Sequence, residues 1–385
     1  MSYVDRLFRH KDKNSAAPEY LNQDYLRLMK EGPVLMKLNS LRPTYSKSMT
    51  NSRRRVLIVM TALIGEFVVS IPAIRAFIKK NPDVLLDLLV SSSYAELAKR
   101  IIGVNNVYLA QSVHMRVTEM KISEKIPKGV YDDVYVMRIS KSAYTILRKI
   151  MFQNLHPNSV NLLKYFFSLA SDKKNIILQY HNLAYKLLDL PAPKILPEPE
   201  TLFNFSNCSS NKINSFPFLK TKYVVIHAAS GWRPRLWFPE RWAELSRLLH
   251  EDGYNVVFIG AGQKDLVEYS KILSNTKVKV YSLIDKISSW EVVCVIKNAS
   301  VLIGIDSGPR NIADILGVPN IGMLGPSVYN FKPLRRYSYI IDKLRRKHPG
   351  LVWIGSSYPL DAISVKEVYS IVNKIRQSRH GKGVI

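Results

Sequence analysis

Residues 301–313 read VLIGIDSGPRNIA and combine a strand, a tight turn and the start of a helix. The apolar run predicts a buried strand, and Asp306 or Ser307 is a suitable N-cap for the helix that follows. Pro309 fits the first helical turn, where its missing N–H is not needed. Free N–H groups at such a helix start form a seat for a phosphate or diphosphate. The stretch therefore predicts an open α/β sheet that binds a nucleotide at the carboxyl end of this strand.

The same strand–turn–helix pattern also occurs for purely structural reasons, so the rest of the chain must support it. It does, because short apolar strands and amphipathic helices alternate along both halves, which is typical of βαβ units and a largely parallel sheet. Strands are predicted over residues 55–60, 84–90, 104–110, 131–139, 223–229, 254–262, 301–306 and 320–326. Helices are predicted over residues 70–81 and 94–102, within 144–190, after Gly308, and over 239–253, 266–273, 289–299 and 364–376.

A chain of 385 residues is long enough for two domains. Between residues 190 and 219 prolines are interspersed with Asn and Ser without a sustained hydrophobic period, which is typical of a linker. Two α/β domains that face each other place the carboxyl ends of both sheets at one cleft. The predicted division is a basic N-terminal extension (1–50), a Rossmann-like domain (51–195), a linker (196–220), a second Rossmann-like domain (221–360) and a C-terminal helix and tail (361–385).

The formal net charge of +26 is the outlier in the composition. It predicts attraction to a polyanion: a nucleic acid, an anionic membrane surface or an acidic glycolipid. A nucleic-acid partner is disfavoured, because the basic residues are dispersed and no recognition helix or RNA-stacking motif is present. A basic surface without a specific partner is the simpler alternative, although the excess is larger than solubility requires.

The two cysteines, Cys208 and Cys294, have no CxxC spacing, so we expect neither a zinc site nor a disulfide framework, and a reducing compartment fits best. The N-terminus lacks the apolar core of a signal peptide. Residues 56–74 are apolar over about the length of a minimal membrane span, but Glu66 lies in the middle. We therefore interpret this stretch as a strand, a turn and a helix.

The turn after the first strand, residues 61–66 (TALIGE), carries a candidate catalytic group. Gly65 permits close backbone approach at the helix start. Glu66 stands at the mouth of the predicted cleft, where a carboxylate can act as a general base. Helix capping by an acidic residue is the structural alternative.

The strand that ends at His227 leads into a loop that carries Arg233 and Arg235. Guanidinium groups at the carboxyl edge of a sheet suit a diphosphate, because they grip it with parallel hydrogen bonds. We expect His227 to lie in the core, and Trp237 and Trp242 to pack rather than to stack on a ligand.

A further loop, residues 260–265 (GAGQKD), ends another strand of the same sheet and is placed to reach a ribose or a base. There is no Walker sequence, no GxGxxG directly after the first strand, no GxSxG elbow and no histidine pair with metal-ligand spacing. An anion seat and a carboxylate base without a metal motif favour group transfer from a nucleotide-activated substrate.

Residues 227–242 and 301–327 together resemble glycosyltransferase family 9, the ADP-heptose:lipopolysaccharide heptosyltransferases. Residues 55–77 resemble the opening of the same family. The resemblance implies a GT-B fold, in which two Rossmann-like domains face a cleft. It implies that residues 51–195 bind the acceptor, that residues 221–360 bind the nucleotide-sugar, and that transfer is inverting and requires neither a metal nor a cofactor.

Carried over position by position, the resemblance implies a role for each candidate. Glu66 stands where the family has an aspartate base, and Thr61 and Gly65 belong to the loop on the acceptor side. Arg235 stands where the family has a phosphate-binding lysine, and Asn311 where it has a histidine. The implied donor-binding residues are Arg233, Arg235, Gly262, Asp265, Asp306, Ser307 and Gly308.

The expected donor is ADP-heptose and the expected acceptor is a lipopolysaccharide core or a related glycan or glycolipid. The positive charge would hold a cytoplasmic enzyme peripherally on the anionic inner-membrane surface without a spanning helix. Two alternatives stay open. One is a glycosyltransferase of the same fold that uses another nucleotide-sugar, and the other is a non-catalytic polyanion-binding or scaffold protein that kept the fold.

Overall fold

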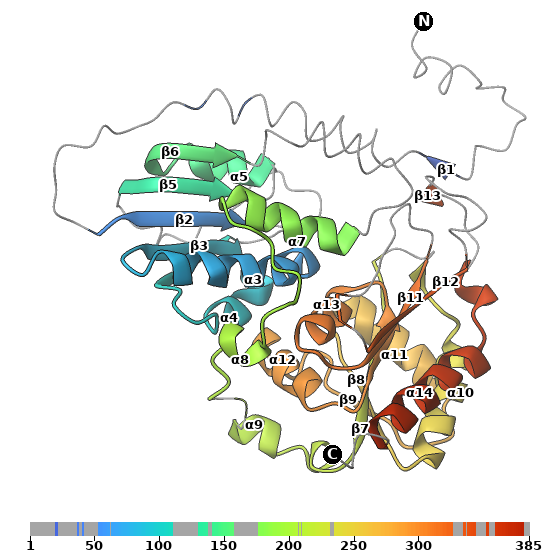
Figure 1. Ribbon diagram of the computed structural model, residues 1–385. Helices are drawn as coiled ribbons and strands as arrows, with labels where there is room; N and C mark the ends of the chain where they lie inside the picture. Colours follow the sequence, from blue (N-terminus) through green and yellow to red (C-terminus); the bar gives the residue numbers. More distant parts are fainter. Residues whose placement is uncertain are drawn as a thin grey trace, which may run out of the picture.

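The computed structural model describes residues 20–21, 37, 41, 53–61, 63–110, 130–137, 141–157, 176–206, 208, 210–231, 235–325, 334–335, 337–343, 352–353 and 359–380. They form two α/β halves, each built on its own parallel sheet (Figure 1). Arg233 lies outside these residues, as does most of the predicted extension 1–50.

The N-terminal half contains a five-stranded sheet with the order β4-β3-β2-β5-β6. Its first strand lies in the centre. The chain adds β3 and β4 on one side of β2 and then crosses over to add β5 and β6 on the other side, which is the strand order of a Rossmann sheet. The strands are β2 (Arg55–Met60), β3 (Leu85–Ser91), β4 (Asn106–Ala110), β5 (Val130–Val136) and β6 (Met151–Pro157). The helices are α3 (Ile64–Lys80), η1 (Ser92–Tyr94), α4 (Ala95–Ala98), α5 (Lys141–Leu147) and α7 (Ile176–Leu187).

The C-terminal half repeats the design in a six-stranded sheet, β12-β11-β10-β7-β8-β9, which reverses between β7 and β10. Its strands are β7 (Tyr223–His227), β8 (Asn255–Phe258), β9 (Tyr281–Ser282), β10 (Leu302–Ile305), β11 (Asn320–Leu324) and β12 (Ser338–Asp342). Its helices are α10 (Pro239–Glu251), α11 (Gln263–Asn275), α12 (Ser289–Lys297), α13 (Gly308–Ile315), η4 (Pro359–Ala362) and α14 (Val365–His380).

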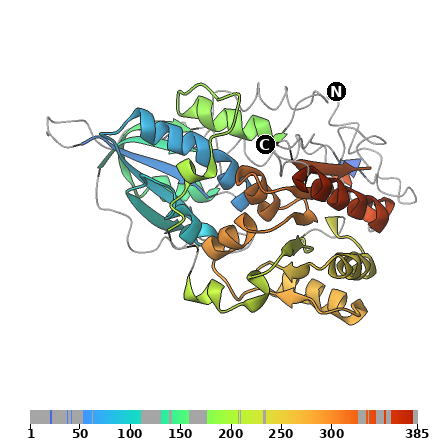
Figure 2. The same ribbon diagram turned by 60° about the horizontal axis from the view of Figure 1, so that its bottom comes forward.

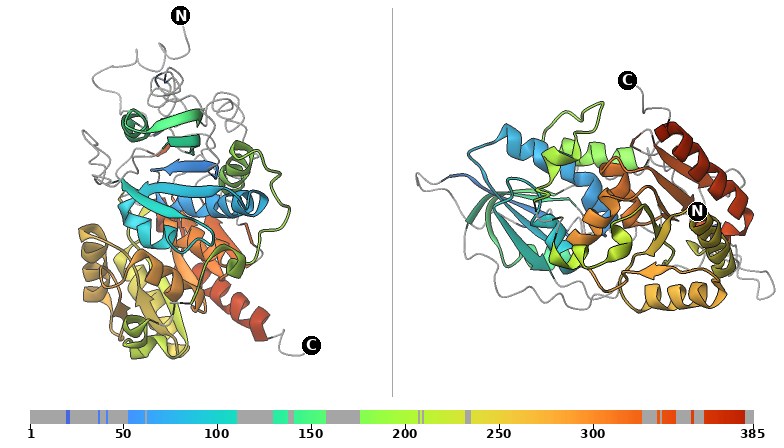
Figure 3. Two further views of the ribbon diagram at one scale, coloured as in Figure 1. Left: turned by 90° about the vertical axis from the view of Figure 1, so that its left-hand side faces the viewer. Right: turned by 90° about the horizontal axis from the view of Figure 1, so that it is seen from below.

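The C-terminal helix α14 belongs to the C-terminal half, where it packs on α10 at the outer side (Figure 3). A short antiparallel pair, β1 (Tyr20–Leu21) with β13 (Val352–Trp353), brings a piece of the N-terminal segment beside the C-terminal half. The apolar stretch 56–74 is the predicted strand, turn and helix, with Pro72 inside α3. Among the described residues, no helix is long and apolar enough to cross a membrane.

The two halves meet through helices. α3 packs against α13, and α12 packs against α4, so helices from both halves lie between the two sheets (Figure 2). One apolar core runs across this boundary and includes Phe67 and Ile71 from α3 together with Ile312 and Ala313 from α13. The contact buries apolar side chains on both partners, and the two halves are therefore held in one arrangement by the hydrophobic effect.

One element of the sequence prediction is wrong. We expected helices across 144–190, but Met151–Pro157 forms the strand β6 at the edge of the sheet. The polar residues of this strand obscure its pattern in the sequence. His156 and Asn154 form hydrogen bonds with the buried Asp133 of β5, at 2.8 and 3.3 Å respectively. His156 also stacks on the Tyr135 ring.

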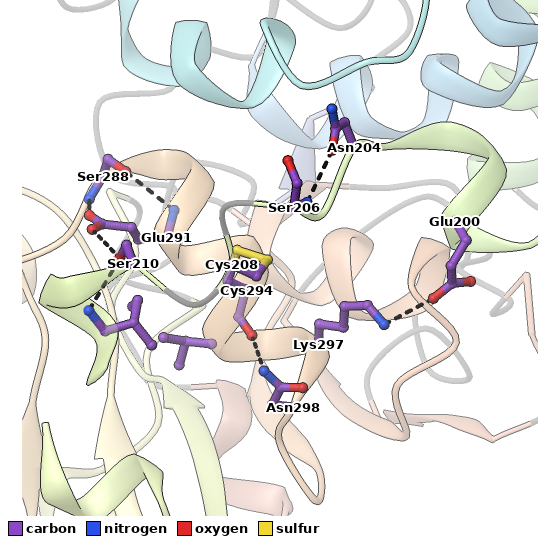
Figure 4. The surroundings of a disulfide bond; sticks show 12 residues. Glu200, Asn204, Ser206, Cys208, Ser210, Ser288, Glu291, Cys294, Lys297 and Asn298 are labelled. Carbon is purple, nitrogen blue, oxygen red and sulfur yellow. Dashed lines mark hydrogen bonds and ion pairs between the residues drawn. A yellow bond between two sulfur atoms is a disulfide. The ribbon is translucent and has the colours of Figure 1, made fainter. Parts of the chain in front are cut away.

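The expectation that the two cysteines form no disulfide is also wrong. Cys208 and Cys294 form a disulfide with a Cα–Cα distance of 5.2 Å (Figure 4). Cys294 lies on α12, whereas Cys208 belongs to the connecting segment 196–220 with α8 (Pro199–Leu202), α9 (Asn211–Asn214) and η2 (Pro217–Leu219). The cysteines are 86 residues apart, so only the folding of this segment over α12 brings them together. The disulfide removes the sequence argument for a reducing compartment.

The connecting segment is held on α12 by more than the disulfide. Ser210 donates to Glu291, which also completes a capping box with Ser288 at the start of α12. Lys297 at the other end of α12 pairs with Glu200 at 2.9 Å (Figure 4). The segment predicted as a linker is therefore packed against the C-terminal half.

Cleavage of the disulfide should lower the free energy of unfolding. Its removal frees a closed loop in the unfolded chain, an effect worth about 2–4 kcal/mol. Urea denaturation of the oxidised protein, with and without a dithiol reductant, and of Cys208→Ser measures this. The reductant should leave Cys208→Ser unchanged, and equal midpoints for the oxidised and reduced wild type would contradict the prediction.

Asp133 should make stability depend on pH. Burial opposes its ionisation, but the hydrogen bonds from His156 and Arg54 outweigh burial and hold the pKa of Asp133 below its usual range. A lowered folded-state pKa stabilises the protein above the unfolded pKa of about 3.9, and this contribution is lost as the pH falls through the folded value.

We therefore expect Asp133→Asn to lose about 1–3 kcal/mol at pH 7, because the buried carboxylate gives up its charge-assisted hydrogen bonds with Arg54 and His156. The variant should also show a shallower loss of stability than the wild type below about pH 4. Urea denaturation between pH 3 and 7 measures both effects. Asp83→Asn, at an exposed position, is the control and should follow the wild-type curve.

Candidate functional site

A cavity of about 610 Å³ opens where the two halves meet. Its volume is typical of a site for a small molecule or a nucleotide. The N-terminal half contributes the start of α3, and the C-terminal half contributes the ends of β7, β8 and β10, at the point where its sheet reverses. Its lining residues are Leu63, Ile64, Gly65, Glu66, Val69, His227, Ala229, Ser230, Gly231, Arg235, Ala261, Gly262, Gln263, Lys264, Asp265, Asp306, Ser307, Gly308 and Asn311.

The helices α3, α11 and α13 all begin at this cavity. Their N-caps are Leu63, Gly262 and Ser307, and within the described part of the chain none of these side chains caps its helix by a hydrogen bond. The first N–H groups of a helix have no partner inside the helix, and the helix dipole makes this end positive. The cavity wall therefore favours an anion.

The predicted seat at residues 306–308 lies in this wall, as expected. The expected side-chain cap is absent, however, because the hydroxyl of Ser307 is buried without a hydrogen-bond partner among the described residues. Ser307 has the extended backbone that is usual at an N-cap, but its side chain makes no capping hydrogen bond. The N–H groups at the start of α13 thus remain available to a ligand.

Arg235 reaches the seat from the loop after β7, as predicted. Its Nη2 lies 3.4 Å from Oδ2 of Asp306, and both side chains are largely buried. A guanidinium at this position can bind a diphosphate with two hydrogen bonds.

His227 was expected in the core, and this prediction is wrong. It lies in the cavity wall, with Nε2 3.4 Å from Oδ1 of Asp265 and with Nδ1 buried. Asp265 packs on Gly260, where any Cβ would overlap the carboxylate. The absence of a side chain at Gly260 therefore leaves room for Asp265. The structure thus brings Gly262 and Asp265 to the wall, as predicted.

Other wall residues were not predicted as site residues: Ser230, Gln263, Lys264 and Asn311. Lys264 lies beside Gly231, where a Cβ would be 3.3 Å from its Nζ. The sequence signal for Lys264 was its place in the loop 260–265, next to Asp265. Trp237 and Trp242 are fully buried and pack edge to face at 4.9 Å, which confirms their structural role.

Glu66 lies in the first turn of α3, half-buried in the cavity wall. α3 begins six residues earlier than predicted, so Glu66 belongs to the helix rather than to the turn before it. A Cβ on the preceding Gly65 would stand 2.8 Å from Nδ2 of Asn311 and 3.8 Å from Cα of Gly308. The close approach expected at Gly65 is therefore observed, and it is made to the C-terminal half. Thr61 follows β2 but does not line the cavity.

The arrangement can bind an anion against helix ends and a guanidinium, with a carboxylate on the opposite wall. In the described ranges, no group of three or more His, Cys, Asp or Glu side chains is placed to hold a metal ion.

The chain is similar to known proteins of one family. The family model described as "Glycosyltransferase family 9 (heptosyltransferase)" matches residues 120–346. Lipopolysaccharide heptosyltransferase 3 of Escherichia coli is 22% identical over 287 residues, which span 69% of this chain and 82% of that protein. Lipopolysaccharide heptosyltransferase 2 of the K12 strain is 23% identical over 301 residues, 72% of this chain and 85% of that protein.

Solved structures show the same fold. The E. coli ADP-heptose heptosyltransferase II aligns with a TM-score of 0.64 and 20% identity, covering 85% of this chain and 99% of its own. The E. coli heptosyltransferase WaaC with ADP-2-deoxy-2-fluoro heptose aligns with a TM-score of 0.61 and 19% identity, covering 83% and 99%. The fold is GT-B, as expected.

Gly308→Ala should open the cavity. The added Cβ would overlap the side chain of Ile64 across the boundary between the halves, and relief requires α3 and α13 to separate. Overpacking of this kind costs about 1–3 kcal/mol. We therefore expect Gly308→Ala to bind a nucleoside diphosphate at least roughly tenfold more weakly than the wild type, as measured by calorimetry.

The double variant Gly308→Ala/Ile64→Ala removes the overlapping atoms and should recover most of the affinity. Binding that stays at the wild-type level in Gly308→Ala would show that the halves need not approach this closely.

Proposed function

This chain belongs to glycosyltransferase family 9 and is a glycosyltransferase, and from that premise we propose that it transfers heptose from ADP-heptose to a lipopolysaccharide core or a related glycan. One observation carries the proposal: a single cavity is lined by a carboxylate, Glu66, from the N-terminal half and by an uncapped helix end with Arg235 from the C-terminal half. A donor diphosphate suits the helix end, and an acceptor hydroxyl suits the carboxylate.

The choice of donor rests on the relatives. The E. coli enzyme WaaC has been solved with ADP and with ADP-2-deoxy-2-fluoro heptose. We transfer this donor to the present chain as a proposal, because the residues that would bind the diphosphate, Asp306, Ser307 and Gly308, line the same cavity as the loop 262–265. That loop would contact the ribose through Asp265, and Arg233 would add charge from the neighbouring loop.

The proposed step is a displacement at the anomeric carbon. Glu66 takes the proton of an acceptor hydroxyl while the hydroxyl oxygen forms a bond to the anomeric carbon from the face opposite the diphosphate. The bond from that carbon to the phosphate oxygen breaks, and the nucleoside diphosphate leaves with the bonding electron pair. Attack from the opposite face inverts the configuration of the sugar.

The leaving group gains negative charge during this step, and the wall is built to stabilise it. The N-terminus of α13 and the guanidinium of Arg235 lie at the seat before the reaction starts, so little reorganisation is needed. We propose that Arg235 exchanges Asp306 for the diphosphate when the donor binds. These fixed charges would take the place of a metal ion and of any cofactor.

The net charge of +26 supports a peripheral position at an anionic membrane. We propose the cytoplasmic face of the inner membrane, with the N-terminal half toward a glycolipid acceptor; this location rests on the proposed donor and acceptor alone, since the disulfide does not support a reducing compartment. Gly65 would then line the acceptor side of the cavity, and Thr61 would belong to the loop that precedes it.

Glu66→Gln tests the catalytic assignment. A glutamine has nearly the same shape but cannot accept the proton, so turnover should fall about 10²–10⁴-fold. ADP affinity and thermal stability should stay near the wild-type values. The assay follows ADP release from ADP-heptose with a lipopolysaccharide core acceptor.

Glu96→Gln is the matched control, because Glu96 is exposed on α4 and pairs only with Lys99 among the described residues. Wild-type turnover in Glu66→Gln would refute the base assignment. A comparison of ADP, GDP, UDP and CDP by thermal stabilisation tests the donor: a preference for another diphosphate would indicate another nucleotide-sugar. Stabilisation by none of them would favour a scaffold protein.

A further inference from the structure

Arg310 is an unusual residue for the place it occupies. It lies in the first turns of α13, directly after the diphosphate seat, yet its side chain is fully buried. No carboxylate of the described residues forms an ion pair with it, and its Nε and Nη1 have no hydrogen-bond partner there. An isolated buried charge is strongly unfavourable, so its presence requires a compensating interaction.

A glycine in the neighbouring strand leaves space for this side chain. The aliphatic part of Arg310 lies over β11 at Gly322, where any Cβ would overlap it. Ile340 of β12 bounds the same space, with its Cδ1 3.1 Å from that Cβ position. The strand therefore accommodates a long cation where an apolar side chain would be expected.

The hydrogen bond of Arg310 is to its neighbour in the cavity wall. Its Nη2 donates to Oδ1 of Asn311 at 2.7 Å. A guanidinium can only donate, so the amide atom it meets must be the oxygen. The amide nitrogen of Asn311 then faces the other way, toward Gly65 at the start of α3. The N–H groups of Asn311 therefore lie beside the start of α3, and Asn311 lines the cavity there.

We propose that Arg310 is a positioning residue for the donor diphosphate: it fixes the amide of Asn311 with its N–H groups toward the cavity, and the diphosphate that Asn311 binds compensates the buried charge. This inference rests on the proposed function, since it takes a nucleoside diphosphate as the ligand. It adds Arg310 and Asn311 to the donor site, behind and beside the seat at residues 306–308. The bond from the guanidinium to the amide oxygen polarises the amide, which strengthens the hydrogen bonds that its N–H groups donate.

Calorimetric titration with ADP and with AMP tests the proposal. Arg310→Met keeps the length and apolar character of the buried stem and removes the charge. We expect ADP to bind about tenfold more weakly, AMP to lose less, and kcat/KM for the donor to fall through KM. Arg310→Lys retains the charge and should recover part of the ADP affinity. Arg247→Met, which removes an exposed charge on α10, is the control and should bind ADP as the wild type does.

A double-mutant cycle separates this role from simple packing. If Arg310 acts through Asn311, Asn311→Ala should weaken ADP binding by a similar factor, and the double variant should lose no more than either single variant. Asn311 is only half-buried, so Asn311→Ala serves as the test if Arg310→Met fails to fold. Unchanged ADP affinity in Asn311→Ala by itself overturns the proposal.

The outcomes are distinct from those of the proposed function. If the wild type binds no nucleoside diphosphate, the proposed function fails and this inference fails with it. If the wild type binds ADP, and Arg310→Met binds both ADP and AMP as tightly as the wild type does, Arg310 is a packing residue only. Equal losses of ADP and AMP affinity in Arg310→Met would also overturn the role of the charge.

Discussion

The close approach of two helix N-termini, α3 from one half and α13 from the other, is the constraint on which the cavity depends. Gly65 and Gly308 stand at the contact, where a Cβ on either would meet the opposite half. Their lack of side chains brings Glu66 and the seat at residues 306–308 to one cavity. Steric fit and apolar burial hold this geometry, because one core with Phe67 and Ile312 spans the boundary.

The positive character of the cavity comes from the backbone as much as from side chains. α3, α11 and α13 all present their N-termini to it. Helix ends are fixed by the packing of the whole helix, so they act as preorganised partners for an anion. The side chains add to this field in two ways. Arg235 adds a charge that can exchange partners, and Arg310 adds one that is locked in the interior.

The strands and the cavity residues could be predicted where one local pattern decided the outcome. β2, β7 and β10 are apolar runs whose burial on both faces leaves few alternatives, and the segments directly after them carry Glu66, Arg235 and Asp306. Predictions failed where the conformation of a segment depended on a partner far along the chain. β6 carries His156, whose place in a strand depends on Asp133 of β5.

The sequence by itself determined the two α/β sheets, the strand–helix turns that carry the candidate groups and the resemblance to one family, because apolar periodicity and turn chemistry act over a few residues. The tertiary structure alone decided that Cys208 meets Cys294, that His227 faces the cavity, and that Arg310 is buried against Gly322. Each of these depends on the packing of distant segments, which residue spacing does not encode. Neither a side chain's partner nor its exposure exists until the sheets and helices have assembled around it.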